Sequence, residues 1–129
     1  MVADFWTTAT GTVTLTLYEV PADVTTSITP GGAPVTITNT TPGQNGLATF
    51  SGTTGQKVSL NITGVSGYNN WVNVSIKKPD GSTLVLGTYG SGGGFIGTQT
   101  LPSTGTYTIL VDPWHAAVGS ATLTLNNVP

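Results

Sequence analysis

The chain has 129 residues, which is enough for one domain with a single hydrophobic core. Three basic and five acidic residues leave a net charge of -2, so the positive surface that nucleic-acid binding requires is missing. Cysteine is absent, which excludes disulfides and thiolate metal sites, and no apolar run approaches the roughly 20 residues that a membrane-spanning helix needs.

The first predicted element is a strand at Thr12–Tyr18, in which valine and leucine alternate with threonine. Its sequence returns at the other end of the chain. Residues 4–21 (DFWTTATGTVTLTLYEVP) and 112–129 (DPWHAAVGSATLTLNNVP) align at an offset of 108 with ten identities in eighteen positions. The matched Asp, Trp, Gly and Pro residues lie outside the alternation, so the likeness indicates a repeat.

A repeat at this spacing has the size of a domain, which favours a tandem array. We interpret residues 1–21 as an extra terminal strand that repeats residues 109–129 and ends a preceding unit, and residues 22–129 as a single β-sandwich domain. Trp6 and Trp114 occupy matching positions in the two copies. Both are expected to have a packing role, either closing the end of the sandwich or packing at the junction between repeats.

Nine further short strands are expected in chain order, because period-two alternation recurs and helical periodicity is missing. They lie near Val24–Thr29, Val35–Thr40, Leu47–Ser51, Lys57–Thr63, Trp71–Lys77, Thr83–Gly87, Phe95–Leu101, Thr106–Asp112 and Ser120–Leu125. Alternation turns a set of apolar and aromatic side chains inward: Phe50, Val58, Leu60, Ile62, Val72, Val74, Ile76, Leu84, Leu86, Tyr107, Ile109, Val111, Leu123 and Leu125. Short strands separated by Gly- and Pro-containing turns predict an all-β fold, an antiparallel, jelly-roll-like β-sandwich of about eight to ten strands.

Four segments, GQKVSLNITG, VNVSIKKPDGSTL, TLPSTGTYTILVD and VGSATLTL, follow one another between residues 55 and 125. In this order they resemble the signatures of bacterial pre-peptidase C-terminal domains. Their sequences are still more similar to tandem repeats of large bacterial surface or secreted proteins, including the Rhs type that bears YD repeats. The resemblance covers roughly residues 22–129 and implies a jelly-roll-like β-sandwich of accessory character, outside the cell and without chemistry of its own. The acidic run that such domains often carry is replaced here by GVSGYNNWVN, which argues against calcium binding.

The segment GYNNWVN (67–73) is the best candidate for a binding site. Alternation with inward-facing valines places Trp71 and Asn73 outward, with Tyr68, Asn69 and Asn70 on the adjoining loop. An exposed indole flanked by amides suits a glycan, because the aromatic face covers the C–H face of a sugar ring and the amides bind its hydroxyls. The alternative is that Trp71 covers a sheet edge or packs against a neighbouring domain.

Hydrolase chemistry has little support in the sequence. The single histidine, His115, lies three residues after Asp112, but no G-x-S-x-G motif accompanies Ser103 or Ser120. The repeat-related position of His115 is Thr7, which no catalytic histidine could occupy. We therefore expect His115 to be a loop residue and the protein to be no enzyme.

Cofactor and metal motifs are also weak. GGGFIG (92–97) fits G-x-G-x-x-G, but it leads into a strand and not into the helix that binds pyrophosphate. The aspartates are scattered, so neither a metal nor another cofactor is expected. A calcium site built from Asp112 and backbone carbonyls stays open as an alternative.

The doubled terminal strand predicts self-association. Both copies suit the same strand position, which we expect to lie at a sheet edge. The surplus copy exposes Val13, Leu15, Leu17 and Tyr18 together with unpaired backbone groups. It either pairs beside the resident strand of its own chain and extends the sheet, or joins the sheet edge of a neighbouring chain by strand addition. Repetition of this head-to-tail contact gives a ring or a fibre.

These features predict a non-catalytic, extracellular or cell-surface β-sandwich repeat, a structural or adhesive unit of a bacterial surface protein or fibre. Its expected partners are copies of itself or neighbouring repeats, with no nucleic acid and no membrane span. The second hypothesis is a carbohydrate-binding module whose partner is a glycan.

Overall fold

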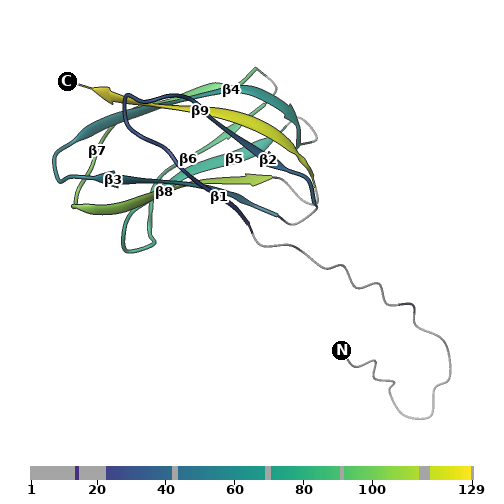
Figure 1. The fold of residues 1–129 in the computed structure, drawn as a ribbon, viewed down its shortest axis with the longest axis horizontal. Coiled ribbons are helices and arrows are strands. Elements are labelled where there is room, and N and C mark those ends of the chain that lie inside the picture. The colour runs from purple at the N-terminus through teal and green to yellow at the C-terminus, as the bar shows by residue number, and fades with distance from the viewer. Residues whose placement is uncertain are drawn as a thin grey trace, which may run out of the picture.

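The computed structural model describes residues 14, 23–41, 44–68, 71–90, 92–113 and 117–128, and within them the chain forms nine β-strands and no helix (Figure 1). The strands are β1 (Val24–Ser27), β2 (Val35–Asn39), β3 (Gly46–Gly52), β4 (Lys57–Gly67), β5 (Val72–Lys77), β6 (Thr83–Tyr89), β7 (Gly94–Thr100), β8 (Gly105–Pro113) and β9 (Gly119–Val128). Each overlaps a range predicted from alternation. The predicted strand Thr12–Tyr18, apart from Thr14, lies outside the described residues, as do Trp6 and Trp114.

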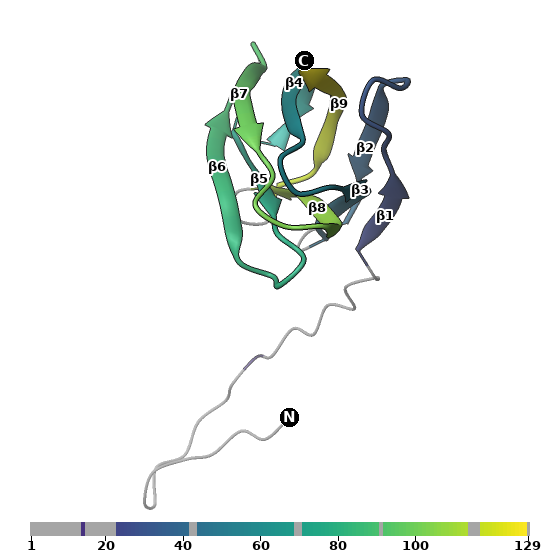
Figure 2. The same ribbon diagram turned by 90° about the vertical axis from the view of Figure 1, so that its left-hand side faces the viewer.

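The nine strands form two packed sheets (Figure 2). One sheet has five strands in the order β1-β3-β8-β5-β6, and the other has four in the order β2-β9-β4-β7. Neighbouring strands pair antiparallel except β1, which runs parallel to β3. This arrangement confirms the predicted all-β sandwich.

The core lies between the two sheets, because each sheet turns its apolar residues toward the other. In β9, Ala121, Leu123 and Leu125 are buried and alternate with half-buried threonines, as expected for a strand with one solvated face. Ile109 of β8 belongs to the same core cluster and comes from the facing sheet. The predicted inward positions are buried except for two residues of β6.

A β-bulge explains these two exceptions. Ile76 of β5 pairs with Val85, whereas the next residue, Lys77, pairs with Thr83, so Leu84 is an extra residue in β6. The insertion shifts the alternation by one position. Leu84 is consequently half-buried, and Leu86, predicted to point inward, is 62 % exposed.

The closing strand β9 is not an edge strand, contrary to the sequence-based expectation. It pairs with β2 on one side and along most of β4 on the other, so both of its backbone edges are used. Alternation reports that one face of a strand is buried, but it carries no information on whether one or two neighbours pair with it. The position that the terminal repeat specifies is therefore an interior slot.

The corrected inward positions can be tested with two leucine truncations. We expect Leu123→Ala to lower the free energy of unfolding by about 2–5 kcal/mol, because it opens a cavity in the core. Leu86→Ala is expected to change it by no more than about 0.5 kcal/mol, since that side chain is exposed. Urea denaturation of both variants measures the difference, and equal losses would contradict the bulge.

Candidate binding surfaces

The predicted binding segment GYNNWVN spans the junction between β4 and β5. Trp71 immediately precedes β5, its backbone N–H donates to the Tyr68 carbonyl at 3.0 Å, and its side chain is 49 % exposed. Val72 and Val74 are fully buried and alternate with Trp71 and Asn73. Both residues therefore face away from the core, in agreement with the sequence analysis.

A polar row crosses three strands next to Trp71. Asn73 of β5 pairs with Asp112 of β8 on one side and with Thr88 of β6 on the other. The Thr88 hydroxyl donates to Asn73 Oδ1 at 2.8 Å, which fixes the orientation of the amide. We call Trp71, Asn73, Thr88 and Asp112 the Trp71 surface. It combines an aromatic ring with hydroxyl, amide and carboxylate groups on the outer face of the five-stranded sheet.

Tyr68 does not belong to this surface, although it was predicted to lie on the same exposed loop. Its side chain is fully buried, and its hydroxyl donates to Asn39 Oδ1 at 2.6 Å. The Asn39 amide in turn donates to the Gln44 carbonyl at 2.9 Å. Burial raises the pKa of Tyr68 to about 12. The residue thus joins β4 to β2 and to the segment after β2.

The backbone at the end of β4 explains the inward position of Tyr68. Gly67 has φ of 77° and Tyr68 has φ of 54°, so two successive residues adopt left-handed conformations that break the strand alternation. The Tyr68 N–H donates to the Val118 carbonyl at 2.7 Å and holds the turn against the segment before β9. Asn69 and Asn70, the remaining predicted glycan contacts, lie outside the described residues.

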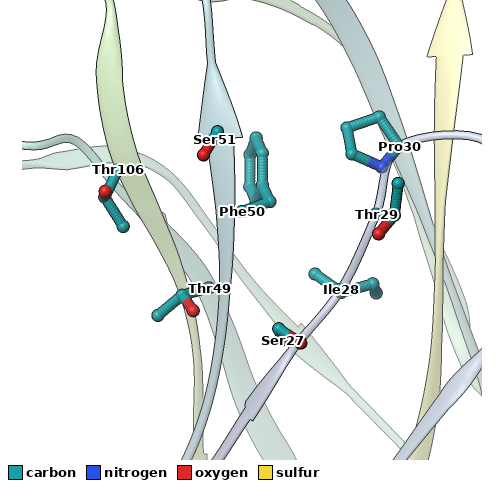
Figure 3. Close-up of a pocket in the computed structure, with 8 residues that line it drawn as sticks. All are labelled: Ser27, Ile28, Thr29, Pro30, Thr49, Phe50, Ser51 and Thr106. Carbon is teal, nitrogen blue, oxygen red and sulfur yellow. The ribbon is translucent and has the colours of Figure 1, made fainter.

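A second candidate surface, a cavity of about 420 Å³, lies beside β1 and was not predicted from the sequence (Figure 3). Its lining combines five hydroxyl-bearing residues with three apolar ones and contains no charge: Ser27, Thr29, Thr49, Ser51, Thr106, Ile28, Pro30 and Phe50. Phe50 stacks on Tyr107 with ring centroids 5.5 Å apart. Such a lining suits a neutral polar ligand.

The cavity forms because β1 is shorter than the strand beside it. β1 pairs with β3 only as far as Ser27 and Thr49, and the last contact is the Ile28 N–H donating to the Thr49 carbonyl at 2.9 Å. The chain then turns away at Pro30 while β3 continues. Backbone groups along a strand point alternately to its two neighbours, so those of Ser51 face the cavity on the side that β1 has left. This parallel pairing is non-local, and no local sequence pattern indicates it.

The described part of the chain holds no group of three His, Cys, Asp or Glu side chains that could bind a metal ion. Asp80 accepts hydrogen bonds from the Ser82 hydroxyl at 2.6 Å and the Ser82 N–H at 2.9 Å, and these bonds lower the pKa of its carboxyl group. It therefore stabilises the predicted KPDGS turn. His115 lies outside the described residues. Among the described residues, no helix is long and apolar enough to cross a membrane.

The buried hydroxyl of Tyr68 is expected to contribute to stability in a pH-dependent way. At pH 7, Tyr68→Phe should lower the free energy of unfolding by about 1–3 kcal/mol, because the buried Asn39 oxygen loses its donor. The folded pKa of about 12 exceeds the ordinary value of 10.0, so the unfolded chain ionises first as the pH rises. The wild-type protein should therefore lose its advantage over the variant above pH 10. Equal urea midpoints at pH 7 would contradict the assigned bond.

Comparisons with known proteins identify the fold. No protein-family model and no curated protein matches the sequence. Among solved structures, the chain is similar to PliG, a periplasmic inhibitor of g-type lysozyme from Aeromonas hydrophila, with a TM-score of 0.52, 17 % identity, and coverage of 82 % of this chain and 99 % of PliG. It is also similar to the pre-peptidase C-terminal domain of collagenase from Bacillus anthracis, with a TM-score of 0.61, 11 % identity, and coverage of 81 % and 96 %. At these identities the similarity establishes a shared β-sandwich fold.

Proposed function

We propose that the chain is a non-catalytic, extracellular β-sandwich repeat that serves as a structural or adhesive unit of a bacterial surface protein or fibre, and that units join head to tail by strand addition. The similar structures come from a periplasmic inhibitor and from a collagenase domain, which supports a location outside the cytoplasm. The lysozyme inhibitor also illustrates that a sandwich of this kind can act through a protein partner.

The observation that carries the proposal is the composition of the sheet edges. The edge strands of the two sheets are β1, β6, β2 and β7, and none of them contains a charged residue or a proline within its bounds. Natural proteins usually place such residues on edges to prevent pairing with other chains. Here Lys57 and Lys77 lie on the interior strands β4 and β5 instead. The edges are therefore chemically suited to accept a further strand.

Strand addition predicts that the size of the protein in solution depends on its first 20 residues. We expect the full chain to form oligomers whose proportion rises with concentration, whereas a chain starting at Pro21 keeps all nine strands and stays monomeric. Sedimentation velocity at several concentrations measures the difference. The double variant Leu15→Asp/Leu17→Asp in the full chain is the matched control and should also be monomeric. Identical monomers for the full and shortened chains would overturn the proposal.

The Trp71 surface favours a second candidate function, glycan binding. An indole that is 49 % exposed beside Asn73, Thr88 and Asp112 offers both a stacking face and hydrogen-bonding groups to a neutral sugar. This candidate is compatible with an adhesive role.

Glycan binding predicts that Trp71→Ala weakens binding to neutral polysaccharides at least about tenfold, since stacking on the ring is lost. Glycan arrays followed by calorimetric titration provide the measurement. Phe95→Ala is the control, because Phe95 is 58 % exposed but belongs to β7 in the other sheet. A flat response of the unmodified chain across neutral glycans would remove this candidate.

A further inference from the structure

β9 lies between β2 and β4, and we call this position the β9 slot. At Gly119 the slot leaves no room for a side chain. A Cβ atom at Gly119 would collide with the Ser66 carbonyl oxygen and lie 2.8 Å from the Tyr68 backbone nitrogen, because β4 bulges toward β9 at this point. Any residue with a side chain would push the two strands apart. In the N-terminal copy the matching position is Gly11.

The buried positions of the slot are matched in the same way. Leu123 and Leu125 are at most 1 % exposed, and their counterparts at the offset of 108 are Leu15 and Leu17. On the outer face, the Thr122 hydroxyl lies 3.0 Å from the Thr36 hydroxyl of β2, and Thr14 is the counterpart of Thr122. The first copy thus retains these three residues, which contact β2 or the core.

The two copies differ at four positions of β9. Within β9 the differing residues are Ser120, Ala121, Asn126 and Asn127, which correspond to Thr12, Val13, Tyr18 and Glu19. Of these four, Ala121 alone is buried, and it is replaced by another apolar residue. The apolar pattern of the buried positions is therefore kept in the first copy, so this segment is compatible with the core that β9 covers.

We propose that residues 9–20 of one molecule fill the β9 slot, between β2 and β4, of a second copy of the chain. This inference rests on the proposed head-to-tail function and names an acceptor other than the free edges: the incoming strand exchanges with β9, between β2 and β4.

Geometry prevents the segment from filling the slot of its own molecule. In the slot, Val20 would take the place of Val128, beside Pro30, whose carbonyl accepts a hydrogen bond from the Asn127 side chain. Val24 lies beside Gly46 at the start of β3, whereas Val128 pairs with Lys57, which follows the end of β3; the six residue steps from Gly46 to Gly52 alone span about 20 Å. The four steps from Val20 back to Val24 reach at most about 14 Å. The occupant must therefore come from another copy.

Three side-chain hydrogen bonds favour the resident strand. The Asn127 amide donates to the Pro30 carbonyl at 3.2 Å, Gln56 donates to Asn127 Oδ1 at 3.0 Å, and Asn126 donates to the Ser59 hydroxyl at 3.3 Å. Tyr18 and Glu19 replace these asparagines in the first copy. The exchanged state is consequently the less populated one, and Asn127→Ala should increase it.

Disulfide trapping tests the exchange, because the chain contains no native cysteine. Asn61 of β4 pairs with Thr124 of β9 on one side and with Phe95 of β7 on the other, so on the β9 side it meets only the occupant of the slot. Thr16 is the counterpart of Thr124. The full chain with Asn61→Cys and Thr16→Cys should form covalent oligomers in a glutathione redox buffer, as seen on non-reducing gels and by mass spectrometry.

Control variants establish that the register is that of β9. Asn61→Cys with Thr124→Cys should form a disulfide within one chain, which shows that the paired geometry permits the bond. Asn61→Cys with Thr12→Cys should yield at least about tenfold fewer oligomers, since Thr12 corresponds to Ser120, which pairs elsewhere on β4. Asn127→Ala added to the trapping pair should raise the yield.

The glycine requirement provides a matched pair of substitutions. Gly11→Val in the trapping variant should lower the yield of oligomers at least about tenfold, because the new side chain would collide with Ser66. Thr10→Val should leave the yield unchanged, since the counterpart of Thr10 is Val118, which immediately precedes β9 and has a side chain that is 39 % exposed. Equal effects of the two substitutions would overturn the proposed site.

The remaining outcomes separate the exchange from the proposed function. The chain could form oligomers in sedimentation while the Asn61→Cys/Thr16→Cys disulfide does not form. That result would place the contact at a free edge, so it would overturn the strand exchange and leave the proposed head-to-tail assembly in place. A disulfide confined to single chains would overturn the requirement for a second copy. If the chain is monomeric in sedimentation and no disulfide forms, both the strand exchange and the head-to-tail assembly are contradicted.

Discussion

The pairing of β9 on both sides is the constraint on which the sandwich depends. Without this strand the smaller sheet would divide into β2 and the β4-β7 pair, and the side chains opposite Leu123 and Leu125 would lose their cover. The approach of β9 to β4 also fixes the turn at Gly67 and Tyr68, because the Tyr68 N–H bonds to the Val118 carbonyl just before β9. Tyr68 then extends this linkage through Asn39 to β2. One strand thus closes the core and orders the segment that leads to Trp71.

In this sandwich, hydrogen bonds between neutral side chains connect neighbouring strands, a role that ion pairs share in most proteins. Hydroxyl pairs cross neighbouring strands at Thr36 and Thr122 and at Ser66 and Ser120, and amides join the ends of β4 and β9. Such bonds are directional and insensitive to ionic strength, unlike ion pairs on a protein surface. The edge strands β1, β6, β2 and β7 consequently carry no charged side chains, so two copies of the chain can approach at these edges without charge repulsion.

Local alternation was sufficient to predict all nine described strands and most of the core, because each depends on which face of a strand is buried. The errors concern features that alternation does not encode. Leu86 faces solvent since an extra residue in β6 shifts the period, and Tyr68 is buried since positive φ values turn the chain inward. The interior place of β9 and the cavity beside β1 depend on pairing between distant segments. The segment GYNNWVN was correctly singled out for an exposed Trp71, but its tyrosine belongs to the fold.

The parallel pairing of β1 with β3 has a mechanical consequence. β1 starts at one end of the sandwich, beside Asn45, whereas β9 finishes at the other end, beside Pro30, as the positions of β1 and of the C-terminus in Figure 1 illustrate. Tension applied between these two points runs along the strands, so it loads the backbone bonds between β1 and β3 together in shear and does not open them one after another. Rupture under load is governed by the unfolding rate rather than by equilibrium stability. The resistance of this sandwich to extension along its long axis therefore depends on the four residues by which β1 pairs with β3.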